Sequence, residues 1–338
     1  MLYETERELS QSRYKDSWER IAGHTGRFIC SVFPAQGVGL LWLVCLGCGT
    51  PTTPELPAPA TVVEIEVQCQ RVAQRLRDEL GDRGDVVVRS PFVLAGDDTA
   101  DALIVRYQQE IEPLERAMRV SYFETVPDRP ITFLLCVHTA SYRELTRHLF
   151  ADEPVSKWGY YKPGRRTVIV NLEHGAAGIG HEMTHALMDF DFPTAPFWFR
   201  EGLAALHESV FVRETAVGTS LEGLRKGRWK AMQSLLDNDR LLTLEALLTA
   251  GKPSTGRAAR RYAQARFFCL FLQRNQQLKT YYQRFKRAGS VDPHGIRTLL
   301  EVLGKQHLED VDRDFRHWLE ELSVTPARRA DAASLDAR

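Results

Sequence analysis

Residues 181–185 read HEMTH, so two histidines stand four positions apart and a glutamate follows the first. On a helix, residues four apart lie one turn above each other on the same face. Two imidazole nitrogens placed in this way can bind one zinc ion at about 2.0–2.1 Å each. Glu182 points near the same face and could accept a proton from water activated by the metal. The spacing therefore predicts a metal-binding helix, with His181 and His185 as ligands and Glu182 as general base.

A catalytic zinc site needs a third protein ligand and an open fourth position. Three acidic residues after His185 compete for this role. Asp191 lies six residues on, where a continuing helix would carry it off the histidine face. Glu201 lies sixteen residues on, beyond the break "DFPTAP", and Glu208 lies two turns further. We rank Glu201 first, Glu208 second and Asp191 third, and Glu208 better suits a hydrogen bond to a ligand imidazole.

The break before Glu201 is what would bring that residue back toward the histidines. Pro193 and Pro196 can end one helix and start the next, with Thr194 as a cap. Glu201 then lies in the second turn of the second helix. Small residues after Glu201 would let the two helices approach closely enough for one ion to bridge them. These residues are Gly202, Ala204 and Ala205.

Other polar residues near this stretch have ordinary structural interpretations. His207 is expected on the surface, and the basic run "RKGRWK" at 225–230 is expected to be a solvated helix face. Tyr160 and Tyr161 either line a cleft or pack as an aromatic pair in a hairpin. None of these residues is predicted to bind the metal.

Strand patterns gather in the first half of the folded part and helical patterns in the second. Strands are predicted at 85–96, at 131–137 and in a hairpin over 157–172. A helix is predicted before them at 66–80, and two more lie between them at 98–118 and 141–150. From residue 178 to about 323 the pattern is helical throughout. This segregation predicts an α+β fold, in which a small mixed sheet with an edge-strand hairpin is followed by a helical body.

The charge balance and the cysteines exclude two classes of protein. The chain has 44 basic and 44 acidic side chains, so no overall field attracts nucleic acid, and we expect no nucleic-acid partner. The three cysteines after residue 48, which are Cys69, Cys136 and Cys269, are scattered and odd in number, so they predict no disulfide framework and no CxxC metal knuckle.

The N-terminal part differs from the rest. Residues 28–48 carry no charge, and a Pro- and Thr-rich stretch follows them. Small residues before Cys48 are similar to the bacterial lipobox, in which a signal peptide is removed and the cysteine is lipidated, although Cys45 stands where a leucine is usual. An uncleaved membrane anchor is the second interpretation and a buried core segment the third. Residues 1–27 are long for such a leader, so we expect translation to start further downstream.

These features divide the chain into four parts. Residues 1–48 are a leader with a signal peptide or membrane anchor, and 49–62 are a linker. Residues 63–325 form the folded domain, and 326–338 form a disordered tail. The expected location is the extracytoplasmic side of a bacterial cell envelope, with the protein held there as a lipoprotein or by the hydrophobic anchor.

The sequence "HEMTH … PFWFREGLAALHE" resembles the gluzincin metallopeptidases, in which HExxH is followed by a glutamate ligand on the next helix. The short spacing and the form W-x-x-E-G-x-A are most similar to the bacterial peptidase MA-like family. The resemblance covers roughly residues 85–275 and implies a zincin-like fold and a zinc-dependent peptidase.

The resemblance also implies roles for particular residues. Tyr262 matches a downstream tyrosine that steadies the oxyanion in many gluzincins. The strand "TVIVNL" at 167–172 would be the sheet edge along which a peptide or protein substrate lies. Thermolysin-type members have an aspartate four residues after the glutamate ligand; here that position is Ala205, so the contact to a ligand histidine must come from elsewhere.

Two functions follow as expectations. The first is a membrane-anchored zinc metallopeptidase, a hydrolase that cleaves peptide bonds with Glu182 as general base. The alternative is a surface-anchored binding or assembly protein that keeps the protease fold without turnover. The intact Glu182 favours the enzyme, because a pure binding protein has no use for that base.

Overall fold

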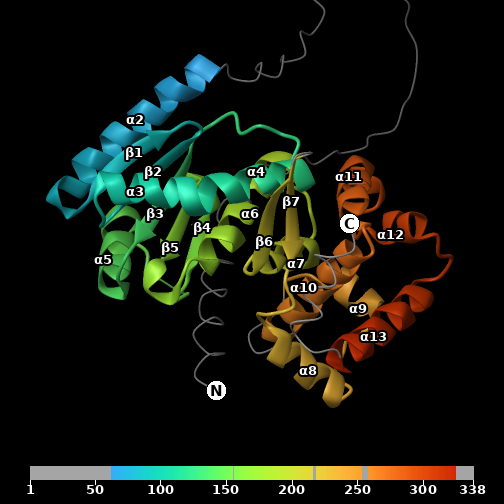
Figure 1. Ribbon diagram of the computed structural model, residues 1–338. Coiled ribbons are helices and arrows are strands. Elements are labelled where there is room, and N and C mark those ends of the chain that lie inside the picture. Colours follow the sequence, from blue (N-terminus) through green and yellow to red (C-terminus); the bar gives the residue numbers. More distant parts are fainter. Residues whose placement is uncertain (1–61, 155, 216–217, 253–257, 325–338) are drawn as a thin grey trace, which may run out of the picture.

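A computed structural model describes residues 62–154, 156–215, 218–252 and 258–324 of the 338-residue chain (Figure 1). The leader 1–48, almost all of the linker 49–62 and the tail 326–338 lie outside these residues. Among the helices that the structure describes, none is both long and apolar enough to cross a bilayer.

A five-stranded mixed sheet fills the left half of the molecule in Figure 1, and α8 to α13 gather on the right. The sheet order is β1-β2-β3-β5-β4, with β2, β3 and β5 parallel and the two outer strands antiparallel to their neighbours. The strands are β1 (Asp85–Arg89), β2 (Phe92–Gly96), β3 (Ile131–Cys136), β4 (Gly159–Lys162) and β5 (Thr167–Asn171). The predicted α+β fold, with a small mixed sheet and a helical body, is confirmed.

The predicted edge strand was wrong. The run at 167–171 forms β5, which lies inside the sheet between β3 and β4, and every residue of β5 is buried. The edge strand is β4, the other arm of the hairpin, in which buried and half-buried residues alternate. The reason is that β5 pairs with the distant β3, and this leaves β4 on the outside. The hairpin itself was predicted correctly.

Alternating side chains of the sheet point into two separate cores. In β5, Val168 and Val170 face one core and Ile169 faces the other. The smaller core lies under α2 (Val62–Leu80) and α5 (Thr139–Phe150). The larger core lies under a long helical segment at 100–121 and under α6 (Ala177–Asp191), and it continues into the helical body.

The long helical segment is irregular just before Pro113. It consists of α3 (Ala100–Arg106), a five-residue π-helical turn (Tyr107–Ile111) and α4 (Glu112–Ser121), with Pro113 in the first turn of α4. Proline has no N–H group to continue the helical hydrogen-bond ladder, so the ladder is rearranged just before it.

The prediction that the chain is helical throughout its second half was wrong. A two-stranded antiparallel hairpin, β6 (Val210–Thr215) and β7 (Gly218–Gly223), follows α7 (Phe197–Leu206). Its first strand has the alternating β-branched residues Val210 and Val212, which favour a strand over a helix. The remaining helices are α8 (Trp229–Asp237), α9 (Leu244–Thr249), α10 (Ala258–Arg274), α11 (Leu278–Ala288), α12 (Ile296–Leu303) and α13 (Leu308–Val324).

Candidate metal centre

The HEMTH sequence lies in the middle of α6, and the loop 192–196 separates this helix from α7. The break falls where the two prolines predicted it. The cap differs from the prediction, because Pro196 rather than Thr194 is the N-cap residue of α7, and it makes no side-chain cap hydrogen bond. An ion pair between Arg200 of α7 and Asp189 of α6 links the two helices across this loop.

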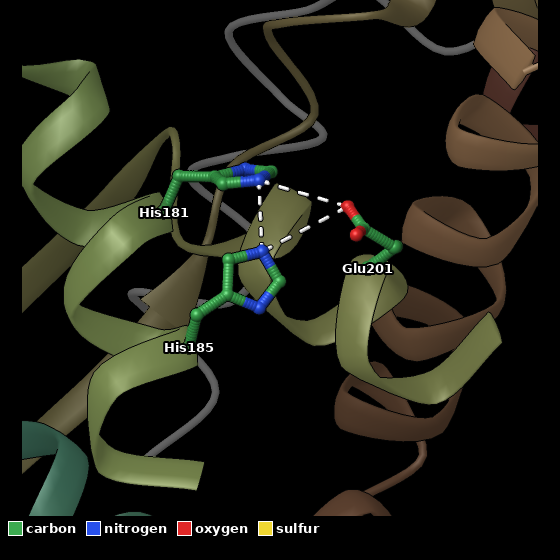
Figure 2. Close-up of side chains that lie close together, drawn as sticks. All are labelled: His181, His185 and Glu201. Carbon is green, nitrogen blue, oxygen red and sulfur yellow. Dashed lines mark hydrogen bonds and ion pairs between the residues drawn. The ribbon is translucent and has the colours of Figure 1, made fainter. Parts of the chain in front are cut away.

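The side chains of His181, His185 and Glu201 converge on one point between α6 and α7 (Figure 2). His181 Nε2 and His185 Nε2 lie 3.3 Å apart, and Glu201 Oε2 lies 3.7 and 3.8 Å from them. An ion at the centre of this triangle would lie about 2.1 Å from each atom, which agrees with the usual zinc–nitrogen and zinc–oxygen distances. Two neutral imidazoles and one carboxylate are also a donor set that zinc accepts. These three residues could therefore hold a metal ion.

The residues predicted to take part in chemistry all line one cleft of about 1020 Å³. It contains His181, Glu182, His185, Glu201 and Tyr262, and also Tyr160 and Tyr161 of the edge strand β4. The cleft thus brings together residues from β4, α6, α7 and α10.

Tyr262 is only 3% exposed, and its ring packs edge-on against Phe197 with centroids 5.8 Å apart. The guanidinium of Arg228 lies 5.5 Å from the centre of the same ring. These contacts fix the ring while the residue remains part of the cleft wall.

A largely buried chain of ion pairs contacts His181 on its Nδ1 side. Its Nδ1 lies 2.9 Å from Glu208 Oε1, on the side of the ring opposite to Nε2. Arg228 binds Glu208 in turn, with Nε donating to Oε2 at 2.8 Å and Nη2 donating to Oε1. The supporting role predicted for Glu208 therefore agrees with the geometry. Glu208 also supplies the contact that Ala205 cannot make.

The charges in this chain stabilise each other. Burial alone would lower the pKa of His181, but the carboxylates of Glu182, Glu208 and Glu201 outweigh it and raise that pKa. Burial would raise the pKa of Glu208, but Arg228 and His181 hold it well below its usual range. Glu208 is therefore ionised, and its carboxylate lies beside Nδ1 of the His181 ring while Nε2 points toward His185 and Glu201.

Arg228 was not identified from the sequence, where it was interpreted as part of a solvated basic face. That interpretation was wrong for this residue, whose side chain is only 14% exposed. Its position follows from the β6–β7 hairpin, which returns the chain to the cleft after α7. Gly227 and Arg228 both have positive φ values, 78° and 49°, so the chain turns sharply at this point. No local sequence signal marks such a return.

Asp191, the third-ranked ligand candidate, lies outside the metal centre. Its Oδ2 accepts a hydrogen bond from Tyr282 at 2.8 Å, and its Oδ1 accepts from Lys286 Nζ at 2.7 Å. The backbone N–H groups of Glu124 and Thr125 also donate to Oδ1. Both oxygens are thus used in joining α6 to α11 and to the end of α4.

His207 is also placed differently from the prediction, because it is 2% exposed rather than on the surface. Thr184 donates to Gly180 O at 2.6 Å, so its hydroxyl oxygen accepts from His207 Nδ1 at 2.7 Å. Burial, followed by the charges of Arg266 and His181, lowers the pKa of His207 to about 3. A neutral histidine therefore packs against α6 through Thr184.

Two glycines allow the close packing of this region. A Cβ at Gly180 would lie 2.4 Å from His207 O, so this glycine lets α6 approach the end of α7. A Cβ at Gly202 would lie 2.9 Å from Ala265 O and 3.0 Å from Cys269 Sγ. Gly202 therefore allows contact with α10, and not the contact with α6 that was predicted for it.

A scan against protein-family models and a search of curated proteins found no match for this chain. The assignment of a function therefore rests on the residues of the cleft and their geometry.

Proposed function

We propose that this protein is a zinc-dependent peptidase of the gluzincin type. The observation that carries the proposal is the convergence of His181 Nε2, His185 Nε2 and Glu201 Oε2, with Glu182 in the same cleft. A triangle of suitable size could arise by chance on a charged surface. It is less expected together with a buried carboxylate–arginine pair that orients one of the two imidazoles.

The zinc ion would be held by His181, His185 and Glu201. When bound there, zinc would act as a Lewis acid that polarises the scissile carbonyl and makes a water molecule more acidic. The rest of the chemistry belongs to the protein. Glu182 follows the first ligand in α6 and lines the cleft, so it takes a proton from the attacking water. It then returns this proton to the nitrogen of the leaving amine.

Tyr262 is assigned the oxyanion-stabilising role. Its hydroxyl would donate a hydrogen bond to the carbonyl oxygen as negative charge develops there. The contacts with Phe197 and Arg228 hold the ring in one orientation, so little reorganisation accompanies the reaction.

The substrate would be an extended segment of a peptide or protein. Among the described strands, none pairs with the outer edge of β4, whose residues line the cleft. A free strand edge presents N–H and C=O groups that can pair with an added strand. We therefore assign substrate main-chain binding to β4, in place of the strand that the sequence had suggested.

Location at the bacterial envelope is part of the same proposal, although the segment concerned lies outside the described residues. Cys48→Ala should release the protein from the membrane fraction if Cys48 is lipidated. Continued membrane association of that variant would favour the uncleaved anchor.

The test of the enzyme combines metal analysis of purified protein with a peptide-library cleavage assay, for wild type and Glu182→Gln. We expect about one zinc per chain in both proteins and cleavage by the wild type alone. Cleavage by both would exclude Glu182 as the base. Zinc in both without cleavage by the wild type would favour the non-catalytic binding or assembly protein.

A further inference from the structure

One end of the cleft carries arginines that the proposed chemistry does not use. Arg129, which precedes β3, and Arg166, in the turn between β4 and β5, both line the cleft. They lie near the C-terminal end of α6, because Arg129 packs over the Phe190 ring at 5.7 Å and Phe190 lines the same cleft.

Arg166 is held in place by its backbone. Its φ of 48° is in the left-handed region, where the hairpin turn requires it. Its N–H donates to Pro163 O at 2.9 Å, and its carbonyl accepts from Thr132 N at 3.0 Å. The backbone at Arg166 is thus fixed to both β3 and the hairpin, so the backbone does not have to become ordered at this position when a ligand binds.

The charge of Arg166 is poorly compensated, in contrast to other arginines of the cleft. Arg200 pairs with Asp189, and Arg228 pairs with Glu208. Arg166 Nε is buried and has no hydrogen-bond partner among the described residues. Burial and the charge of Arg129 lower the pKa of Arg166, and Tyr161 and Asp128, which raise it, do not compensate. The Asp128 carboxylate lies 3.1 Å from Arg129 Nε, so it pairs with Arg129. An anionic group from a ligand would accept a hydrogen bond from the unpartnered Arg166 Nε and would reduce the repulsion from Arg129 that its pairing with Asp128 leaves.

The location of Arg166 relative to the metal centre defines which part of a peptide would reach it. Asp189 follows His185 by one helical turn, about 6 Å along α6, and this equals about two residues of an extended chain. Tyr161 of β4 lies beside Asp189, since burial and then the Asp189 carboxylate raise the pKa of Tyr161. The Lys162 end of β4 and the C-terminal end of α6 therefore meet near Arg166.

The direction of the bound peptide follows from strand pairing. Antiparallel pairing is slightly more stable than parallel pairing. A peptide antiparallel to β4 runs from the Lys162 end toward Gly159, so its N-terminal residues lie at the Arg166 end of the cleft.

On this basis we propose that Arg166, together with Arg129, forms a subsite for an acidic side chain of an extended peptide. This Asp or Glu would stand about two to three residues before the bond that is cleaved. The direction and the scissile bond rest on the peptidase proposed above. The recognition of an acidic peptide does not.

The first test measures binding in the Glu182→Gln background, so that turnover does not interfere. Two fluorescent peptides, identical except for Glu or Gln at one position, are compared by fluorescence anisotropy. We expect the Glu peptide to bind roughly ten- to a hundredfold more tightly. Adding Arg166→Glu should abolish this preference, whereas Arg166→Lys should retain part of it.

Arg165→Glu is the matched control. Arg165 is the exposed neighbour of Arg166 in the same turn and is not part of the cleft wall, so the same change of charge there should leave the preference in place. Equal affinity for the two peptides, or equal loss of preference in the Arg165 and Arg166 variants, would overturn the subsite.

A second measurement separates this inference from the proposed activity. The cleavage profile of wild type on a peptide library should show enrichment of Asp and Glu on the N-terminal side of the cut. Cleavage without that enrichment would keep the peptidase and remove the acidic subsite. Preferential binding of the Glu peptide without any cleavage would keep the subsite and remove the peptidase.

Discussion

His181 Nδ1 lies 2.9 Å from Glu208 Oε1, and the same carboxylate is held by Arg228 through two hydrogen bonds. The three side chains come from α6, from the turn after α7 and from the segment after the β6–β7 hairpin. The orientation of His181, a proposed metal ligand in one helix, is therefore supported by a residue 47 positions later in the chain.

Glu208→Gln should weaken zinc binding by roughly 10- to 100-fold, because the neutral amide no longer orients the imidazole as strongly. It should also destabilise the fold by up to roughly 3–5 kcal/mol, since the largely buried Arg228 loses the carboxylate to which it is hydrogen-bonded. Chelator competition measures the first effect and urea unfolding of the metal-free protein the second.

The double variant Glu208→Gln/Arg228→Met separates these two effects. It should recover much of the lost stability but none of the lost zinc affinity, because the pair is removed together while His181 remains unsupported. Glu245→Gln, at an exposed site on α9, is the control. If the stability loss of the double variant equalled the sum of the losses in Glu208→Gln and Arg228→Met, an interaction between Glu208 and Arg228 would be contradicted.

Glu201→Gln should lower mainly the zinc affinity, and Asp191→Asn should lower mainly the stability of the fold. Glu201→Gln removes a proposed ligand, so zinc affinity should fall by more than the roughly 10- to 100-fold typical of an outer partner, with little change in stability. Asp191→Asn should retain zinc and lose roughly 3 kcal/mol of stability, since it breaks the buried pair with Lys286. Zinc analysis and thermal unfolding of both variants decide this. Loss of zinc in the Asp191 variant alone would reverse the ligand assignment.

Tyr262→Phe should lower kcat by roughly 10²-fold or more while zinc content and KM change little, because an oxyanion donor acts mainly in the transition state. Steady-state kinetics on a cleaved library peptide provides the measurement. Tyr107→Phe, in the π-helical turn away from the cleft, controls for loss of a half-buried hydroxyl. Unchanged kcat in the Tyr262 variant would leave this residue with a packing role only.

His207 should make the fold sensitive to acid. Its pKa is about 3 in the folded protein against 6.5 as the ordinary value, so between these values the unfolded chain binds a proton that the folded chain does not. Stability is thus fully present above pH 6.5 and falls below it, by up to about 1.4 kcal/mol per pH unit.

His207→Gln should flatten this dependence between about pH 5 and pH 6.5, where most carboxylates remain ionised. Urea unfolding of the metal-free protein at several pH values tests it. His317→Gln, at an exposed position on α13, is the control and should keep the wild-type slope. The same slope in the His207 variant as in wild type would contradict the assignment.

The features that the sequence predicted well depend on neighbours along the chain. The spacing of His181 and His185 is a helical repeat, and two prolines mark the break that places Glu201 on the next helix. The hairpin at 157–172 is likewise bounded by a local Lys-Pro-Gly turn.

The features that it missed depend on distant pairing or burial. Which arm of that hairpin lies at the sheet edge is decided by the pairing of β5 with β3, across about thirty residues. The β6–β7 strands were missed because helical patterns on both sides were extended across them. His207 and Arg228 were assigned to the surface because polar residues are mostly exposed, and nothing near them in the chain shows that they meet buried partners.

Gly180, which directly precedes the first histidine, cannot carry a side chain unless α6 moves away from His207 O, and Gly202, directly after Glu201, is similarly confined by α10. Other proteins built in this way should therefore be recognisable by a stricter signature than HExxH. It is a glycine immediately before that motif, combined with Glu-Gly shortly downstream. A genome search with this longer signature would discard many chance occurrences of the short one, and it would show how widely this architecture has spread.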